Sequence, residues 1–235
     1  MIAAKSVGEI REILYSAGSL PRTFSSLKVG SRVSRTSTRG ATKICAVSDT
    51  IQMSGRIISD ELRLNGYYCC PEICESEQIL KAFNSLQQMR WRRTPLNEND
   101  QSILWDEAAI DSASELCGLV LKSSLRRQLE KEFSEIRDTV CWANRYRLGE
   151  FIPEHVDSEG DIQVILPIHL PPSQCGGGFT IFHNNRLTEV KQRLGQSIVF
   201  VATKTAHQTT VLVKGMTPED PMRITVVCRI FFAGH

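Results

Sequence analysis

The strongest constraint on the fold is a change of sequence pattern near residue 137. Beyond it, short β-rich runs such as "IQVILPIHL", "SIVFVA" and "RITVVCRIFF" are separated by turns rich in Gly, Pro and Asn. Repeated short strands with such turns predict a barrel or a jelly roll. Six strands are predicted in this region, beginning at residues 138, 162, 179, 197, 209 and 223.

The pattern before residue 137 is mainly helical. A short strand is predicted in "LNGYYCCPEIC". A helix follows in "SEQILKAFNSLQQM", with apolar residues at helical spacing behind Ser76, a suitable N-cap. The run "SASELCGLVLKSSLRRQLEKEFSEI" predicts a second helix. Helices followed by strands indicate an α+β fold, with N-terminal helices packed on a jelly-roll (cupin-like) core.

Composition places the chain among soluble globular proteins. Of 235 residues, 41% are hydrophobic and 23% charged, and no apolar run is long enough to span a bilayer. The net charge of +2 conceals an asymmetry, because residues 1–48 carry eight Lys or Arg against two Glu. We therefore predict a basic N-terminal extension over residues 1–55 and one domain over residues 56–235.

The basic extension permits three interpretations. It suits a cleaved organellar targeting peptide, an arm that contacts phosphates, or a solvated extension that covers the substrate. Glu9 and Glu12 in its amphipathic opening argue against targeting. We expect a cytoplasmic protein, with an organelle or the nucleus as alternatives.

The eight cysteines are scattered irregularly and follow no secretory signal, so reduced thiols are expected. The cluster "CCPEIC" lacks the paired spacings of a structural zinc site. On a strand, Cys69 and Cys70 would also point to opposite faces. We predict no zinc there.

A candidate metal site begins in "NRYRLGEFIPEHVD", where His155 and Asp157 are two residues apart. Residues at this spacing on a strand project from one face. His207 follows 52 residues after His155, in another β-rich region. Two histidines and one carboxylate form the triad that holds Fe(II) with coordination positions left open for chemistry. The alternatives are a chance His-x-Asp pair and a core histidine bonded to the backbone.

Two arginines on the last predicted strand are candidate anion ligands. Arg223 opens that strand, and a guanidinium can bind a carboxylate through two parallel hydrogen bonds. Arg229 lies six residues further on, so strand alternation places both on one face. Either could instead face solvent.

Taken together, these motifs resemble the Fe(II)- and 2-oxoglutarate-dependent dioxygenases, closest to the prolyl 4-hydroxylase-like branch. The resemblance covers roughly residues 60–232. It rests on the order Tyr146, Gly149, His155 and Asp157, "CGGGFTIF", "GQSIVF", His207 and Arg223. It implies a double-stranded β-helix core and an enzyme that uses Fe(II), 2-oxoglutarate and O2, with ascorbate as a candidate reductant.

The resemblance also implies roles for individual residues. His155, Asp157 and His207 would be the catalytic iron ligands, and Arg223 would bind the distal carboxylate of 2-oxoglutarate. Tyr146 stands where this branch has a tyrosine that hydrogen-bonds the cosubstrate, although a packing aromatic is an equal alternative. His169 stands near the place of a second cosubstrate-binding tyrosine. The long gap between His207 and Arg223 implies an inserted loop at "KGMTPEDP".

A second branch shares part of the pattern. "NRYRLG" and the spacing of Arg223 and Arg229 are similar to the AlkB nucleic-acid demethylases. In that branch Asn144 and Tyr146 would contact 2-oxoglutarate, and Arg229 would support the site. Against it, Thr225 and Val227 replace the expected Asn and Thr, and the "CGGGF" turn belongs to the hydroxylase branch.

The predicted function is hydroxylation of an unactivated C–H bond in a small metabolite, amino acid or protein side chain, with release of succinate and CO2. The alternatives are an AlkB-like demethylase and a non-catalytic jelly-roll binding module. A small molecule or peptide is the expected partner, nucleic acid ranks second, and no membrane is expected. The basic extension, the segment after Asp157 and "RWRRTPLNENDQSILWDEA" are the candidate substrate loops, and the three tryptophans are predicted to pack.

Overall fold

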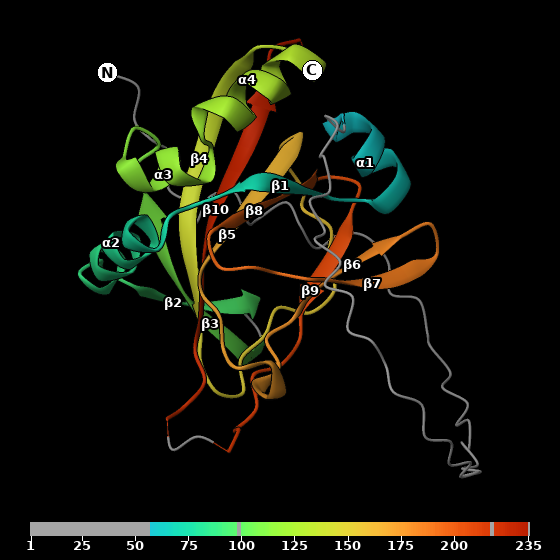
Figure 1. The fold of residues 1–235 in the computed structure, drawn as a ribbon. Helices are drawn as coiled ribbons and strands as arrows, with labels where there is room; N and C mark the ends of the chain where they lie inside the picture. Colours follow the sequence, from blue (N-terminus) through green and yellow to red (C-terminus); the bar gives the residue numbers. More distant parts are fainter. Residues whose placement is uncertain (1–56, 98–99, 217–218, 235) are drawn as a thin grey trace, which may run out of the picture. The chain divides into compact units, whose positions relative to one another are not determined.

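The computed structural model describes residues 57–97, 100–216 and 219–234 (Figure 1). The predicted extension over residues 1–55 lies outside these residues. No helix of the described part is long and apolar enough to cross a bilayer.

The core consists of two antiparallel sheets. The larger has seven strands in the order β1-β8-β5-β10-β4-β3-β2, and the smaller has three in the order β7-β6-β9. The larger sheet comprises β1 (Tyr68–Ile73), β2 (Arg92–Asn97), β3 (Asp100–Ile110), β4 (Ile136–Tyr146), β5 (Ile162–His169), β8 (Gln196–Val201) and β10 (Arg223–Phe232). The smaller comprises β6 (Phe179–His183), β7 (Arg186–Val190) and β9 (Ala206–Thr209). This sheet-rich architecture confirms the predicted α+β fold with a jelly-roll core.

Strand β10 organises the interior because it lies between β4 and β5 and is buried on both faces. Its even-numbered residues from Ile224 to Ile230 join the larger apolar core, with the helices. Val227 joins a second core with Phe179 and Ile181 of the smaller sheet. Alternation along β10 therefore directs Arg223, Thr225 and Arg229 toward the smaller sheet.

The described residues form four α-helices: α1 (Ile58–Asn65), α2 (Ser76–Gln87), α3 (Glu115–Val120) and α4 (Ser123–Glu132). Their buried apolar residues belong to the larger core, on the face of the seven-stranded sheet opposite the smaller sheet. Figure 1 shows α2, α3 and α4 on the far side of the main sheet from β6, β7 and β9. One face of the seven-stranded sheet is thus left for the smaller sheet and the candidate site.

The helix predictions need two corrections. Helix α2 is capped by Glu75 and not by Ser76, because Glu75 and Gln78 form a reciprocal capping box. The single helix expected after residue 112 is two helices, since Leu121 leaves the helical conformation with φ −103° and ψ 67°. The break allows Leu121 and Leu125 both to be buried.

The strand predictions also need correction. The segment "RWRRTPLNENDQSILWDEA", expected as a loop, contains β2 and most of β3. Its charged residues and Pro95 do not resemble a buried strand, but β2 is the sheet edge, where proline is tolerated. Conversely, "TTVLVKG" is not a strand beyond Thr209, and β9 instead contains His207. Helix α1 and β7 were not predicted.

The glycine turn before β6 has a conformational requirement. Gly176 and Gly177 have φ of 71° and 73°, and a Cβ at Gly176 would collide with the Val211 carbonyl oxygen. The turn directs the Gly177 carbonyl oxygen toward Arg223, to which it is hydrogen-bonded. "CGGGF" thereby connects the fold to the candidate site.

Candidate active site

The structure brings His155, Asp157 and His207 together. His155 and His207 pair through their backbones, with N–O distances of 3.0 and 2.9 Å. The Nε2 atom of His155 is 3.9 Å from Asp157 Oδ1, and that of His207 is 3.8 Å from Oδ2. One ligand atom from each residue lies within 4.8 Å of the others. The fold therefore brings His207 to the His155–Asp157 pair, and the three side chains form one potential metal-binding group.

Backbone carbonyls fix the orientation of both imidazoles. His155 Nδ1 is 2.9 Å from the Pro153 oxygen, and His207 Nδ1 is 2.9 Å from the Thr205 oxygen. A carbonyl only accepts, so each Nδ1 carries the hydrogen and each Nε2 keeps its lone pair for a metal. This is the usual outer hydrogen bond of a metal-binding histidine.

Arg229 contributes through Asp157. Its Nη2 donates to Asp157 Oδ1 at 2.5 Å, and it also donates to Gln163. Asp157 Oδ2 is buried and has no hydrogen-bond partner. Arg229 thus holds one carboxylate oxygen and leaves the other available, which makes it a positioning residue. Gly160 permits this approach, because a Cβ there would collide with the Arg229 side chain.

His207 is almost fully buried. Only 4% of it is exposed, and its ring centroid lies 4.7 Å from that of Phe200 and 4.2 Å from that of His155. Burial, reinforced by the neighbouring His155, lowers the pKa of His207 to about 4. The imidazole therefore stays neutral, as metal binding requires.

Burial of His207 predicts a pH-dependent stability. In the unfolded metal-free chain this histidine takes up a proton below pH about 6.5, whereas in the folded chain it does so only below about 4. The free energy of unfolding should therefore fall as pH drops from 6.5 to 4, by up to about 3 kcal/mol. Denaturant titrations across this range should show the loss, and His207→Gln should reduce it. His183→Gln, which alters a histidine outside the site, should not.

Arg223 is a buried cation without an acidic partner among the described residues. It is 1% exposed, and its Nη1 donates to Gly177 O at 2.9 Å and to Gln192 Oε1. Its Nε has no hydrogen-bond partner. Burial lowers the pKa of Arg223 to about 10. Because an uncompensated buried charge is costly, this position favours an anionic ligand.

Tyr146 and Asn144 lie beside Arg223. Tyr146 is directly opposite Arg223 in the β4–β10 register, and Asn144 is opposite Thr225. Both are buried, and Asn144 Oδ1 has no hydrogen-bond partner. Burial raises the pKa of Tyr146, so its hydroxyl remains a donor at neutral pH. These polar groups occupy the same sheet face as Arg223.

The structure does not bring His169 to this group. The β5–β10 register shifts between Ile224 and Thr225, so that His169 pairs with Ile224, on the helix side of β10. Its Nδ1 contacts the Met222 oxygen at 2.9 Å, and its ring lies 5.6 Å from that of Phe83 in α2. The irregularity reverses the facing expected from simple alternation, which corrects the cosubstrate role given to His169.

Sequence reasoning missed Gln163 and Gln192. Gln163 interrupts the apolar run "IQVILPIHL", and a polar residue in a buried strand is a recognisable signal. Gln192 lies in a charged segment and has no comparable signal. The tryptophans pack as expected: Trp105 joins Tyr146 and Leu212 in a small buried cluster, and Trp142 lies under the Arg229 guanidinium.

No protein-family model and no curated protein matches the sequence. Solved structures do match the fold. A Pseudomonas putida prolyl-4-hydroxylase has 16% identity and a TM-score of 0.61, over 74% of this chain and 97% of that one. A Trichoplax adhaerens prolyl hydroxylase, solved with a hypoxia inducible factor peptide, has the same identity and TM-score, over 74% and 87% of the two chains.

The chain has the fold of the 2-oxoglutarate-dependent Fe(II) oxygenases. A more distant example is the epimerase SnoN from nogalamycin biosynthesis, solved with Fe3+, α-ketoglutarate and nogalamycin RO. It has 12% identity and a TM-score of 0.55, over 73% of this chain and 82% of that one. Prolyl hydroxylases are among the solved structures that match this fold, as the sequence resemblance predicted.

The residues present fit the groups that the oxygenase fold implies. The free Nε2 atoms and the unpartnered Asp157 oxygen suit an iron ion. The unpartnered Arg223 Nε and the nearby Tyr146 suit a dicarboxylate cosubstrate. Metal and cosubstrate are thus matched to separate sets of side chains on the same sheet face.

Proposed function

We propose that this protein is an Fe(II)- and 2-oxoglutarate-dependent hydroxylase. It would insert oxygen into an unactivated C–H bond of a small metabolite, amino acid or protein side chain, and release succinate and CO2. His155, Asp157 and His207 would hold iron, and Arg223 would bind the distal carboxylate of 2-oxoglutarate.

The observation that carries the proposal is that a set of metal-ligand atoms and a buried cation lie on one sheet face. The triad offers three ligand atoms within 4.8 Å, including a carboxylate oxygen without a partner. Arg223 offers a fully buried positive charge without an acid among the described residues. A non-catalytic jelly roll has no reason to maintain both at the expense of stability.

The roles of this chain are binding, orientation and exclusion of water. Iron with 2-oxoglutarate would supply the oxidative chemistry. Pro153 and Thr205 keep each Nε2 directed to the metal position, and Arg229 keeps one Asp157 oxygen occupied so that the other binds. Phe179 and Phe200 beside His207 limit the access of water to that ligand.

The described tryptophans do not favour a nucleic-acid substrate. Trp91 is engaged with Arg145, and Trp105 is buried, so neither offers a free stacking surface for a base. Peptide and small-molecule complexes occur among the structural neighbours. We therefore rank a small molecule or peptide above nucleic acid.

Succinate release should identify the substrate. Purified protein with Fe(II), 2-oxoglutarate and O2 should be screened over free amino acids, peptides, small metabolites and methylated oligonucleotides. We expect substrate-dependent succinate from one of the first three groups and a product 16 Da heavier. Removal of a methyl group from an oligonucleotide, lost on deletion of residues 1–48, would instead establish the demethylase alternative.

A further inference from the structure

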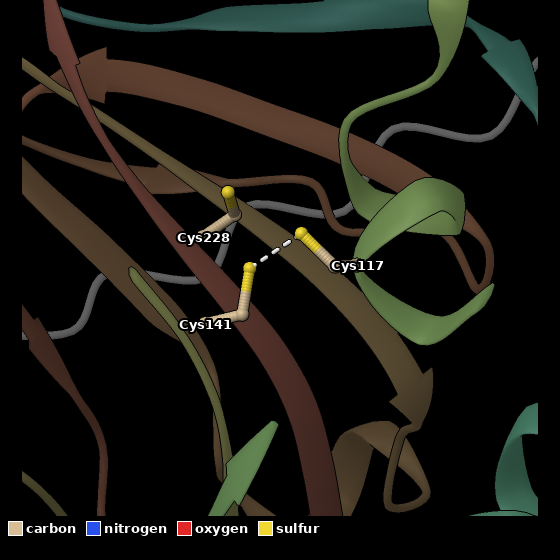
Figure 2. Close-up of side chains that lie close together, drawn as sticks. All are labelled: Cys117, Cys141 and Cys228. Atoms are coloured by element: carbon tan, nitrogen blue, oxygen red, sulfur yellow. Dashed lines mark hydrogen bonds between the residues drawn. The ribbon is translucent and has the colours of Figure 1, made fainter. Parts of the chain in front are cut away.

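A second cluster of possible metal ligands lies on the other face of the main sheet. Cys117 of α3, Cys141 of β4 and Cys228 of β10 are all buried, with exposed fractions of 3%, 3% and 0%. Figure 2 shows their side chains together, with the contact between Cys117 and Cys141 dashed. The three sulfur atoms lie within 4.8 Å of one another. We call these residues the thiol cluster.

The fold holds the thiol cluster in place. Cys141 and Cys228 are direct cross-strand neighbours in the β4–β10 pair. Cys117 is brought to them by α3, whose first turn is capped by Ser114. All three belong to the larger core, so no side chain has to leave solvent to complete the group. The cluster is therefore assembled before any ligand arrives.

The three sulfurs of the thiol cluster converge on one point. Cys117 Sγ and Cys141 Sγ are 2.6 Å apart, and all three sulfurs lie within 4.8 Å of one another. Cysteine binds metal ions as the thiolate, so three sulfurs at this spacing can hold one ion once their protons are released.

Ligand number and type select the kind of ion. In the described part of the chain, no fourth histidine, cysteine or carboxylate joins this group. Structural zinc sites almost always have four ligands, and hard cations prefer oxygen, whereas Cu(I) is selected by soft sulfur ligands.

The geometry points to a sulfur-only site for Cu(I), formed by Cys117, Cys141 and Cys228 and separate from the candidate iron site. Cys228 faces the helices, whereas Arg229, the next residue, faces Asp157. The backbone of β10 therefore lies between the two sites. The candidate iron site offers nitrogen and oxygen ligands, which suit Fe(II), and the thiol cluster offers soft sulfur ligands, which select Cu(I).

Binding of Cu(I) would also link α3 to strands β4 and β10 through metal–sulfur bonds. Cys117 and Cys141 must separate to about 4 Å for both to bind one ion through metal–sulfur bonds of about 2.3 Å. Cys117 lies on a helix of only six residues, which a small shift can accommodate. The expected consequence is a Cu(I)-dependent rise in thermal stability, because only the folded chain presents the three sulfurs together.

The test is an anaerobic titration of the full chain with Cu(I) against a competing Cu(I) chelator. We expect one tightly held ion per chain, with a sulfur-only shell of three ligands in the copper X-ray absorption spectrum. Cys117→Ser, Cys141→Ser and Cys228→Ser should each weaken binding by more than about 100-fold, since changes outside the ligand shell already cost 10- to 100-fold. Cys70→Ser, which alters a buried cysteine of the same core outside the cluster, should bind normally.

A variant that removes the iron site completes the design. His207→Ala should retain Cu(I) if the ion binds the thiol cluster. Circular dichroism should establish that each serine variant is folded, and the X-ray absorption of the wild-type protein is informative if one is not. Nitrogen or oxygen ligands to copper, loss of Cu(I) to the chelator, or unchanged binding by Cys228→Ser would each overturn the inference. So would a disulfide within the cluster in the freshly purified protein, measured as two fewer of the eight cysteines alkylated after denaturation.

Discussion

Alanine at Asp157 or His207 should abolish succinate formation. Each side chain supplies one of three converging ligand atoms, and two remaining ligands would hold iron weakly. We expect activity to fall by more than the 10- to 100-fold typical of changes to outer-shell partners of a metal site. His155→Ala should behave in the same way, because its Nε2 is the third ligand atom. The measurement is the initial rate of succinate release at saturating iron and 2-oxoglutarate.

A matched control separates loss of a ligand from loss of a histidine. His183 lies in the β6–β7 hairpin, where its Nε2 contacts the Arg63 carbonyl oxygen. His183→Ala should retain wild-type turnover. Normal 2-oxoglutarate turnover in any triad variant would remove that residue from the iron site.

Replacing Arg223 by lysine should raise the 2-oxoglutarate concentration needed for half-maximal turnover by about 10- to 100-fold. An ammonium gives a point charge in place of a planar two-point donor, and one hydrogen bond to a charged group contributes about 1.5–3 kcal/mol. In Arg223→Met, turnover should no longer saturate as the 2-oxoglutarate concentration is raised, because no cation would remain at that position. Both are measured by varying 2-oxoglutarate at fixed iron.

The stability of Arg223→Met provides a second, opposite readout. In the absence of 2-oxoglutarate the buried guanidinium has no acidic partner among the described residues, so an apolar side chain of similar length should leave the free energy of unfolding unchanged or higher. Wild-type protein, but not the variant, should then be stabilised by added 2-oxoglutarate. Arg229→Met is the matched control and should weaken iron binding instead, because Arg229 contacts Asp157. An unchanged requirement in Arg223→Lys would transfer the carboxylate role to Arg229 or Lys214.

The parts of the fold that the sequence predicts are those with a clear apolar pattern. Strands β5, β8 and β10 are rich in Val and Ile and lie in the interior of the larger sheet, so their burial is visible in composition alone. The β2–β3 hairpin was not predicted because β2 is an edge strand, and its sequence RRTPLN is mainly polar and contains a proline. Local pattern describes burial well and edge pairing poorly.

The candidate site also has parts that the sequence predicts and parts that it does not. His155, Asp157, His207 and Arg223 are identifiable because few chemistries need those residue types in that order. The details that make them usable are set by backbone geometry, such as the carbonyls of Pro153 and Thr205 behind the imidazoles. His169 faces the helix side of the sheet because of a register shift between β5 and β10, which the sequence does not reveal. The thiol cluster was invisible because its members are brought together by strand register and by the packing of α3, not by spacing.

The most direct test of the iron and cosubstrate assignment is an anaerobic binding titration of the metal-free protein with Fe(II), in the absence and presence of 2-oxoglutarate. The assignment predicts one Fe(II) per chain, tighter binding of 2-oxoglutarate once iron is bound, loss of iron in Asp157→Ala, and loss of 2-oxoglutarate alone in Arg223→Met. Because no substrate is needed, the result does not depend on finding one. Absence of Fe(II) binding, or 2-oxoglutarate binding that is indifferent to Arg223, would contradict it.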